Sequence, residues 1–105
     1  MRAYQIQDDW SLSNIRLTEL PEPTPGSSEV LVRMKAASLN YRDLVVPQRG
    51  YGHKTGTLPL IPISDGTGEV VAVGDRVTRV QLGDRVCPLC MQNWIAGPPN
   101  QKRLS

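Results

Sequence analysis

The sequence has little of what marks several large classes of protein. It contains two cysteines, too few for the disulfide framework of a small secreted protein. No apolar run approaches the roughly 18 residues of a membrane-spanning helix, and the N-terminus has no apolar stretch like that of an export signal. The net charge of +2 is small and the basic residues are dispersed, which argues against nucleic-acid binding. These absences predict a cytoplasmic protein without a membrane or nucleic-acid partner.

Glycine and proline are abundant instead. Nine residues of each type in 105 favour many turns and short strands over long helices. The length suits one domain, residues 1–105, with a modest core. The chain is therefore expected to be mainly β.

Strand patterns occupy three stretches of the first half. Residues 2–6 and 15–20 can form short strands, and the prolines of segment 21–25 predict an extended surface connector after them. The clearest strand covers residues 29–37, where every second residue is apolar and Arg33 and Lys35 face the other way. The apolar positions of that strand are Val30, Val32, Met34 and Ala36.

The stretch from residue 58 to 86 predicts a β-meander. A turn is expected at residues 65–68, because glycines alternate there, and a strand at the apolar residues 70–73. The tetrapeptide Gly-Asp-Arg-Val follows twice, at 74–77 and 83–86. Glycine tolerates a positive φ without a Cβ clash, so each copy predicts a tight turn between strands.

Residues 39–46 predict one or two helical turns that end at Pro47. Asn40 suits the N-cap, since its side-chain oxygen can accept a backbone N–H of the first turn. Asp43, three residues on, can reach back to the start of the helix. A polar, glycine-rich loop is expected at residues 48–57, and it holds Tyr51 and the single histidine, His53, which is expected to be exposed.

These motifs together resemble the N-terminal, GroES-like domain of the medium-chain dehydrogenase/reductase family. The zinc-independent, quinone-oxidoreductase-like branch is the most similar, and the resemblance covers nearly the whole chain. It implies a mainly β, GroES-like, partly open barrel with one or two short helices. Family members continue into closing strands and a Rossmann cofactor domain. No G-x-G-x-x-G stands at a strand–helix junction here, so we expect the chain to stop before those parts.

The same resemblance implies that the site holds no zinc. The zinc-dependent branch has a cysteine ligand where Asn40 stands, and a Gly-His-Glu motif where this chain has Ile63, Ser64 and Asp65. Catalytic zinc takes about three protein ligands from His, Cys and carboxylates. Asparagine and serine are poor replacements for them.

The Asn-x-x-Asp pattern is similar to the quinone-reductase branch, in which the Asn and a later loop Tyr approach the nicotinamide end of NADPH. The resemblance therefore assigns Asn40 and Asp43 to catalysis and Asn40 and Tyr51 to NADPH. It implies an NAD(P)H-linked oxidoreductase with a small quinone, enone or other carbonyl or alcohol substrate. This chain alone is expected to be inactive, to bind NADPH weakly and to self-associate through exposed strand edges.

Plainer interpretations of these residues remain open. Asn40 and Asp43 also suit a helix cap, Tyr51 an exposed loop aromatic and Asp65 a residue that stabilises a turn. The alternative function is a non-catalytic GroES-like binding module or an inactive truncated product.

Cys87 and Cys90 form a Cys-x-x-Cys pair. A zinc ribbon needs four ligands, and extending the pattern with the same gap meets Asn93. A thioredoxin-like pair normally opens a helix in a βαβ unit, and none is predicted here. We expect two buried or semi-buried thiols in a loop that leaves a strand.

Overall fold

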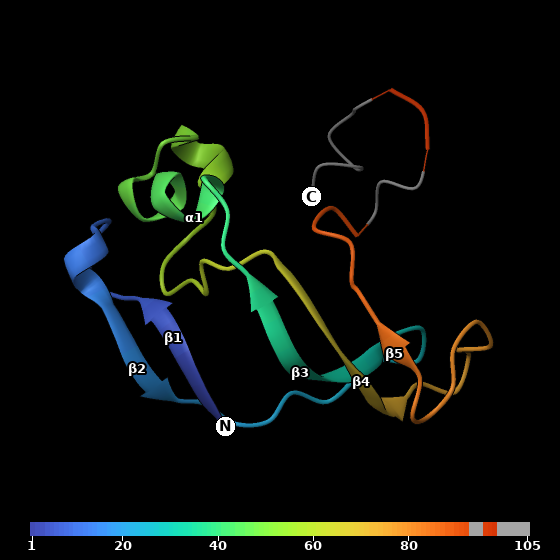
Figure 1. Cartoon of the computed structure of the whole chain (residues 1–105). Helices are drawn as coiled ribbons and strands as arrows, with labels where there is room; N and C mark the ends of the chain where they lie inside the picture. The colour runs from blue at the N-terminus through green and yellow to red at the C-terminus, as the bar shows by residue number, and fades with distance from the viewer. Residues whose placement is uncertain (93–95, 99–105) are drawn as a thin grey trace. The chain divides into compact units, whose positions relative to one another are not determined.

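The computed structural model describes residues 1–92 and 96–98 of the chain. Within these residues it contains short strands, one α-helix and three 3-10 helices (Figure 1). The chain divides into two compact units, and each unit is built from two separate segments. The first unit takes Met1–Thr24 and Ser38–Ser64, and the second takes Pro25–Ala37 and the chain from Asp65 onward.

The first unit begins with an antiparallel hairpin. Strand β1 (Arg2–Ile6) pairs with β2 (Ile15–Glu19), and the register runs from Arg2 opposite Glu19 to Ile6 opposite Ile15. The 3-10 helix η1 (Leu12–Asn14) lies in the connection. Both predicted strands are confirmed, and β2 ends one residue before the predicted end.

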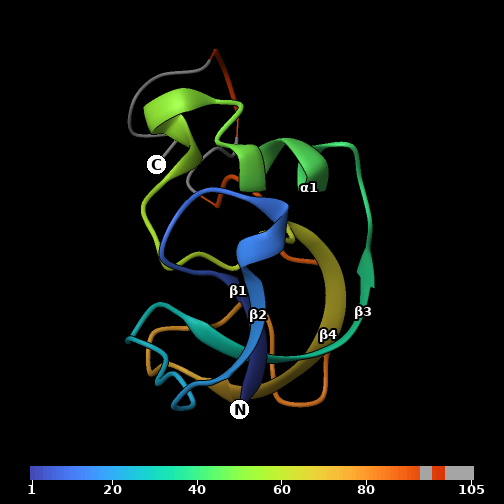
Figure 2. The ribbon, with the colours of Figure 1, turned by 90° about the vertical axis from the view of Figure 1, so that its left-hand side faces the viewer.

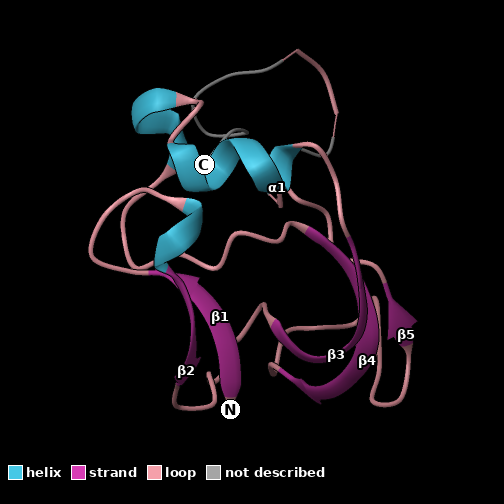
Figure 3. Cartoon of the chain, turned by 60° about the vertical axis from the view of Figure 1, so that its left-hand side comes forward, coloured by secondary structure: helices cyan, strands magenta, loops and turns pink. Residues whose placement is uncertain are grey.

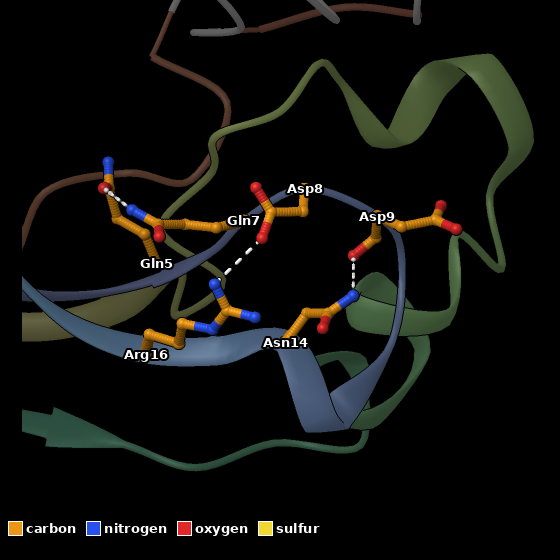
Figure 4. Close-up of polar contacts among 6 residues, drawn as sticks. All are labelled: Gln5, Gln7, Asp8, Asp9, Asn14 and Arg16. Carbon is orange, nitrogen blue, oxygen red and sulfur yellow. Dashed lines mark hydrogen bonds and ion pairs between the residues drawn. The ribbon is translucent and has the colours of Figure 1, made fainter.

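Polar contacts hold the connected end of the hairpin, as Figure 4 shows. Arg16 Nη1 donates to Asp8 Oδ2 at 2.8 Å, and Asn14 Nδ2 donates to the Asp9 carbonyl at 2.8 Å. Asp8 itself has a positive φ of 66°, which aspartate tolerates better than most residues. These bonds fix a turn that the backbone alone would favour weakly.

Ile6 joins the hairpin to the second segment of the unit. Its N–H donates to the Leu60 carbonyl at 2.8 Å, and the Leu60 N–H donates back to the Ile6 carbonyl at 3.2 Å. Ile6 is fully buried, and Val46 and Pro47 are buried in the same unit. The core of this unit is therefore small.

The second segment of the unit contains three short helical turns, coloured cyan in Figure 3. They are α1 (Arg42–Val45), η2 (Val46–Gln48) and η3 (Gly52–Thr55). The helix predicted at 39–46 is thus shorter, and the loop predicted at 48–57 contains a 3-10 turn. Pro47 does not end the helical path, because it stands in the first turn of η2, where its missing N–H costs no bond.

A three-stranded sheet forms the second unit, with the order β3–β4–β5. Strand β3 is Val30–Ser38, β4 is Asp65–Val73 and β5 is Arg85–Val86. β4 and β5 are antiparallel, with Gly68 opposite Val86. Figure 2 shows that β3 and β4 are strongly curved.

The turn predicted at residues 65–68 is wrong, since these residues open β4. The glycines there serve close approach between strands. A Cβ on Gly66 would meet the Ala36 carbonyl oxygen at 2.8 Å, and one on Gly68 would collide with the Arg33 carbonyl oxygen. The facing residue number falls as β4 advances, so β3 and β4 run in opposite directions.

The two Gly-Asp-Arg-Val copies have different structures. In the first, the Val77 N–H donates to the Gly74 carbonyl at 3.1 Å, so the tetrapeptide itself is the turn. In the second, the turn closes earlier, where the Asp84 N–H donates to the Gln81 carbonyl at 3.1 Å and Gly83 has a φ of 89°. The prediction of a turn is confirmed for the first copy, whereas the end of the second copy forms β5.

The apolar face predicted for β3 is only partly covered. Val30 and Val32 are half-buried, but Met34 is 52% exposed and Ala36 is exposed. Val70 of β4 is the buried hydrophobic side chain of this unit among the described residues. The apolar face of β3 is therefore partly buried at the start of the strand and exposed toward its end.

We expect Gly68→Ala to lower the free energy of unfolding by about 1–3 kcal/mol, because the added methyl group must displace the β3 backbone. The exposed neighbour Glu69 supplies the matched control, and Glu69→Ala should change stability by less than about 0.5 kcal/mol. Urea unfolding of both variants measures the difference. If Gly68→Ala were as stable as Glu69→Ala, β3 and β4 would not approach each other closely at Gly68.

Candidate functional site

All three residues assigned by resemblance lie in the first unit. Asn40 precedes α1, Asp43 lies in its first turn, and Tyr51 stands between η2 and η3. The short helix and the loop that follows it therefore position the whole predicted set.

Asp43 and Asn40 hold each other through two hydrogen bonds. The Asn40 backbone N–H donates to Asp43 Oδ2 at 2.7 Å, and the Asp43 N–H donates to the Asn40 carbonyl at 2.9 Å. The predicted reach of Asp43 back to the helix start is confirmed. The predicted N-cap is wrong by one residue: it is Tyr41, which has helical dihedrals and no side-chain capping bond.

The Asn40 side chain is exposed, and its Nδ2 donates to the Ser38 carbonyl at 3.3 Å. Asp43 Oδ1, by contrast, is buried and accepts no hydrogen bond among the described residues. Asp43 thus acts on the backbone of Asn40, while the carboxamide of Asn40 is presented at the surface.

Tyr51 is fixed at its backbone and half-exposed at its ring. Its N–H donates to Oγ1 of the buried Thr55 at 3.2 Å. The Arg42 guanidinium lies 6.0 Å from the ring centroid, at the limit of a cation–π contact. Arg42 belongs to α1, so the same helix that holds Asn40 also contacts the loop tyrosine.

The loop before Tyr51 returns tightly to the end of α1. The Gly50 N–H donates to the Val45 carbonyl at 2.9 Å, and a Cβ on Gly50 would collide with the Val45 side chain. Arg49 adopts a left-handed conformation with φ of 54°, and its guanidinium lies 5.7 Å from the Trp10 ring. Glycine at position 50 is therefore required by close packing, which its place in a polar loop did not reveal.

A pocket of about 360 Å³ lies beside α1, within the range of small-molecule sites. Its lining residues are Tyr41, Leu44, Val45, Gln48 and Gly50. Asn40 and Tyr51 are each next in sequence to a lining residue. No sequence pattern indicated Tyr41 and Leu44, because an aromatic and an apolar side chain are expected to be covered and these two are exposed.

The two cysteines lie in the predicted kind of loop but are not buried. Cys87 and Cys90 follow β5 in an irregular segment, as expected for a strand exit, but both are exposed free thiols. The prediction that these thiols are buried or semi-buried is therefore wrong. The exposure predicted for the His53 side chain falls outside the described residues.

The described residues contain neither a metal-binding cluster nor a membrane-spanning helix. No group of three or more His, Cys, Asp or Glu side chains is arranged to hold a metal ion there. None of the helices described is long and apolar enough to cross a membrane.

The fold has a counterpart in a known protein family. The family model described as the alcohol dehydrogenase GroES-like domain matches residues 26–102. The chain therefore belongs to this family and corresponds to the N-terminal domain of medium-chain dehydrogenases/reductases, a class of oxidoreductases. The GroES-like fold expected from the sequence is confirmed.

Curated relatives agree with this assignment. The chain is 43% identical over 82 residues to a zinc-type alcohol dehydrogenase-like protein of Schizosaccharomyces pombe, covering 77% of this chain and 23% of the relative. It is 37% identical over 86 residues to the human synaptic vesicle membrane protein VAT-1 homolog-like, covering 82% and 20%. The chain thus spans less than a quarter of the length of these relatives.

Solved structures show the same fold. The crystal structure of the human VAT-1 homolog-like protein matches with a TM-score of 0.75 at 36% identity, over 84% of this chain and 28% of that chain. Mycobacterial Rv1454c complexed with NADPH matches with a TM-score of 0.72 at 29% identity, over 84% and 27%.

We expect Asp43→Ala to lower the free energy of unfolding by about 1–2 kcal/mol, because it removes the acceptor of the Asn40 N–H. Asp43→Asn keeps an acceptor oxygen of similar shape and should lose less. Chemical denaturation monitored by circular dichroism measures both. An unchanged stability of Asp43→Ala would refute the role of Asp43 in holding Asn40.

Proposed function

We propose that this chain is the substrate-side domain of a zinc-independent, NADPH-linked reductase that acts on a quinone, an enone or a similar activated carbonyl compound. The observation that carries the proposal is the exposed side chain of Asn40 on a backbone that is held in place. Its backbone is held by Asp43 while its carboxamide is exposed, at the position where the zinc-dependent branch has a cysteine ligand. A similar structure is that of a mycobacterial quinone oxidoreductase, at 29% identity.

The exposed groups fit the nicotinamide end of NADPH, which would supply the hydride. The Asn40 carboxamide has an oxygen that can accept from an amide-bearing ring and an Nδ2 group that can donate two hydrogen bonds, one of which goes to the Ser38 carbonyl. The Tyr51 hydroxyl can donate or accept at the same ligand, with its backbone fixed by Thr55. Asp43 acts indirectly, by holding the Asn40 backbone in place.

The residues do not fit catalytic zinc. Asn40 and Ser64 offer neither a thiolate nor an imidazole nitrogen, the donors that zinc prefers. One relative is named a zinc-type protein, so the family resemblance extends to both branches. The side chains at the ligand positions support the zinc-independent branch for this chain.

A second candidate is a non-catalytic binding module. The observation that favours it is the exposure of large apolar side chains around α1: Leu39 and Tyr41 are about four-fifths exposed, and Leu44 is more than half exposed. Such side chains suit a protein partner or a second copy of the chain. The reductase is preferred because it also accounts for Asn40 and Tyr51.

Asn40→Ala and Tyr51→Phe should each reduce NADPH-dependent turnover about fivefold in an enzyme that joins this domain to a Rossmann cofactor domain. The loss corresponds to one hydrogen bond of about 1 kcal/mol in the transition state. Steady-state kinetics with NADPH and a quinone measure it, beside the melting temperature of each variant.

The control is Tyr4→Phe, which removes the hydroxyl of an exposed tyrosine on β1 and should leave turnover unchanged. Stability losses in Asn40→Ala and Tyr51→Phe with full turnover would assign both residues to the fold and leave the binding module as the better proposal.

The purified protein should contain well below one zinc ion per chain, and its turnover in the joined enzyme should survive dialysis against a chelator. The reason is the lack of thiolate or imidazole donors at positions 40 and 64. Elemental analysis checks the content. One tightly held zinc per chain that is lost together with activity would contradict the zinc-independent mechanism.

A further inference from the structure

The exposed thiols of Cys87 and Cys90 are a feature that the proposed function does not use. Both are free and accessible, and they stand three residues apart directly after β5. Pairs of accessible thiols at this spacing can undergo thiol–disulfide exchange, because that chemistry requires a thiolate that small reagents can reach.

The structure anchors the chain immediately before the pair. Val86 pairs with Gly68 of β4, and its carbonyl accepts a hydrogen bond from Thr67 Oγ1 at 3.1 Å. β5 ends at Val86, and residues 87–90 form no strand or helix. Cys87 thus directly follows a strand whose position is fixed. The segment from Cys87 to Cys90 can bend without breaking hydrogen bonds of the β-sheet.

The segment is also suited to closing into a ring. A disulfide requires Cα atoms about 4.4–6.8 Å apart, and a β-turn brings the first and fourth residues within about 7 Å. In a turn from Cys87 to Cys90, Pro88 would take the second position, where the fixed φ of proline is favoured. Ring closure therefore needs one common turn and no change in β5.

We propose that Cys87 and Cys90 are a reversible dithiol–disulfide pair that exchanges with low-molecular-weight disulfides such as glutathione disulfide. One thiolate attacks a sulfur of the reagent, forms a mixed disulfide and releases one thiol. The second thiolate then attacks the protein sulfur of that mixed disulfide and releases the other thiol. The two cysteines lose two protons and two electrons, and the reagent disulfide is reduced to two thiols.

Competing uses of the two thiols are weaker. A structural zinc needs four ligands, and no third His, Cys, Asp or Glu joins them among the described residues. Cross-linking of two chains competes poorly, since tethered groups have an effective concentration on the order of 1 mM. At about 1 μM protein, closure within the chain is therefore favoured roughly a thousandfold.

The test treats the reduced chain, at micromolar concentration, with glutathione disulfide, and then acid-quenches it for mass spectrometry. We expect the tryptic peptide that begins at Val86 and holds both cysteines to lose two hydrogen masses without retaining glutathione. Dithiothreitol should restore the original mass.

Cys87→Ser and Cys90→Ser are matched controls, and each should retain one glutathione per chain because the resolving thiol is missing. These readouts do not depend on enzyme activity, so they stand or fall separately from the proposed reductase. The proposal would be overturned if the native chain retained two glutathiones or gave covalent dimers as its main product. It would also be overturned if the native chain did not react under conditions in which Cys90→Ser is modified. Tight binding of one zinc by the four thiols of two chains, with loss of exchange, would also overturn it.

Discussion

The backbone pair between Ile6 and Leu60 is the constraint on which the candidate site depends. It joins a hairpin at the start of the chain to a segment more than fifty residues later, and Ile6 is fully buried where the two meet. Everything between β2 and Leu60 that belongs to the first unit, α1 and the Tyr51 loop included, must return to this point. The Arg49–Trp10 contact is a second tie between the same two segments.

How much of the fold could be predicted depended on how local its cause was. The strand at 29–37 was predictable because alternation with period two is visible in the residues themselves. The glycines at 66 and 68 were misread because glycine serves turns and close approach alike, and only the neighbouring strand decides between them. The second Gly-Asp-Arg-Val differs from the first because its turn begins at Gln81, outside the repeated letters.

In the candidate site, too, local contacts could be predicted from the sequence and contacts between distant residues could not. Asp43 reaching back to Asn40 is a contact over three residues, so the sequence predicted it. The cation–π contact of Arg42 with Tyr51 and the packing of Gly50 on Val45 depend on the path of the loop, which no local pattern encodes. The exposure of Cys87 and Cys90 depends on what covers the sheet beyond β5. The link from Asn40 and Tyr51 to a cofactor came from the family resemblance and could not come from their residue types alone.

The interleaving of the two units has a consequence for how the chain is made. Each unit takes two stretches of sequence, and the chain crosses between them at residues 24–25, 37–38 and 64–65. On a ribosome the N-terminal hairpin can form early, but its partner Leu60 emerges only after part of the other unit has already been synthesised. β3 must likewise wait for β4, almost thirty residues later, before its edge is paired. Neither unit can be cut out as one continuous peptide, and the chain must be complete through β5 before the three-stranded sheet has all its strands.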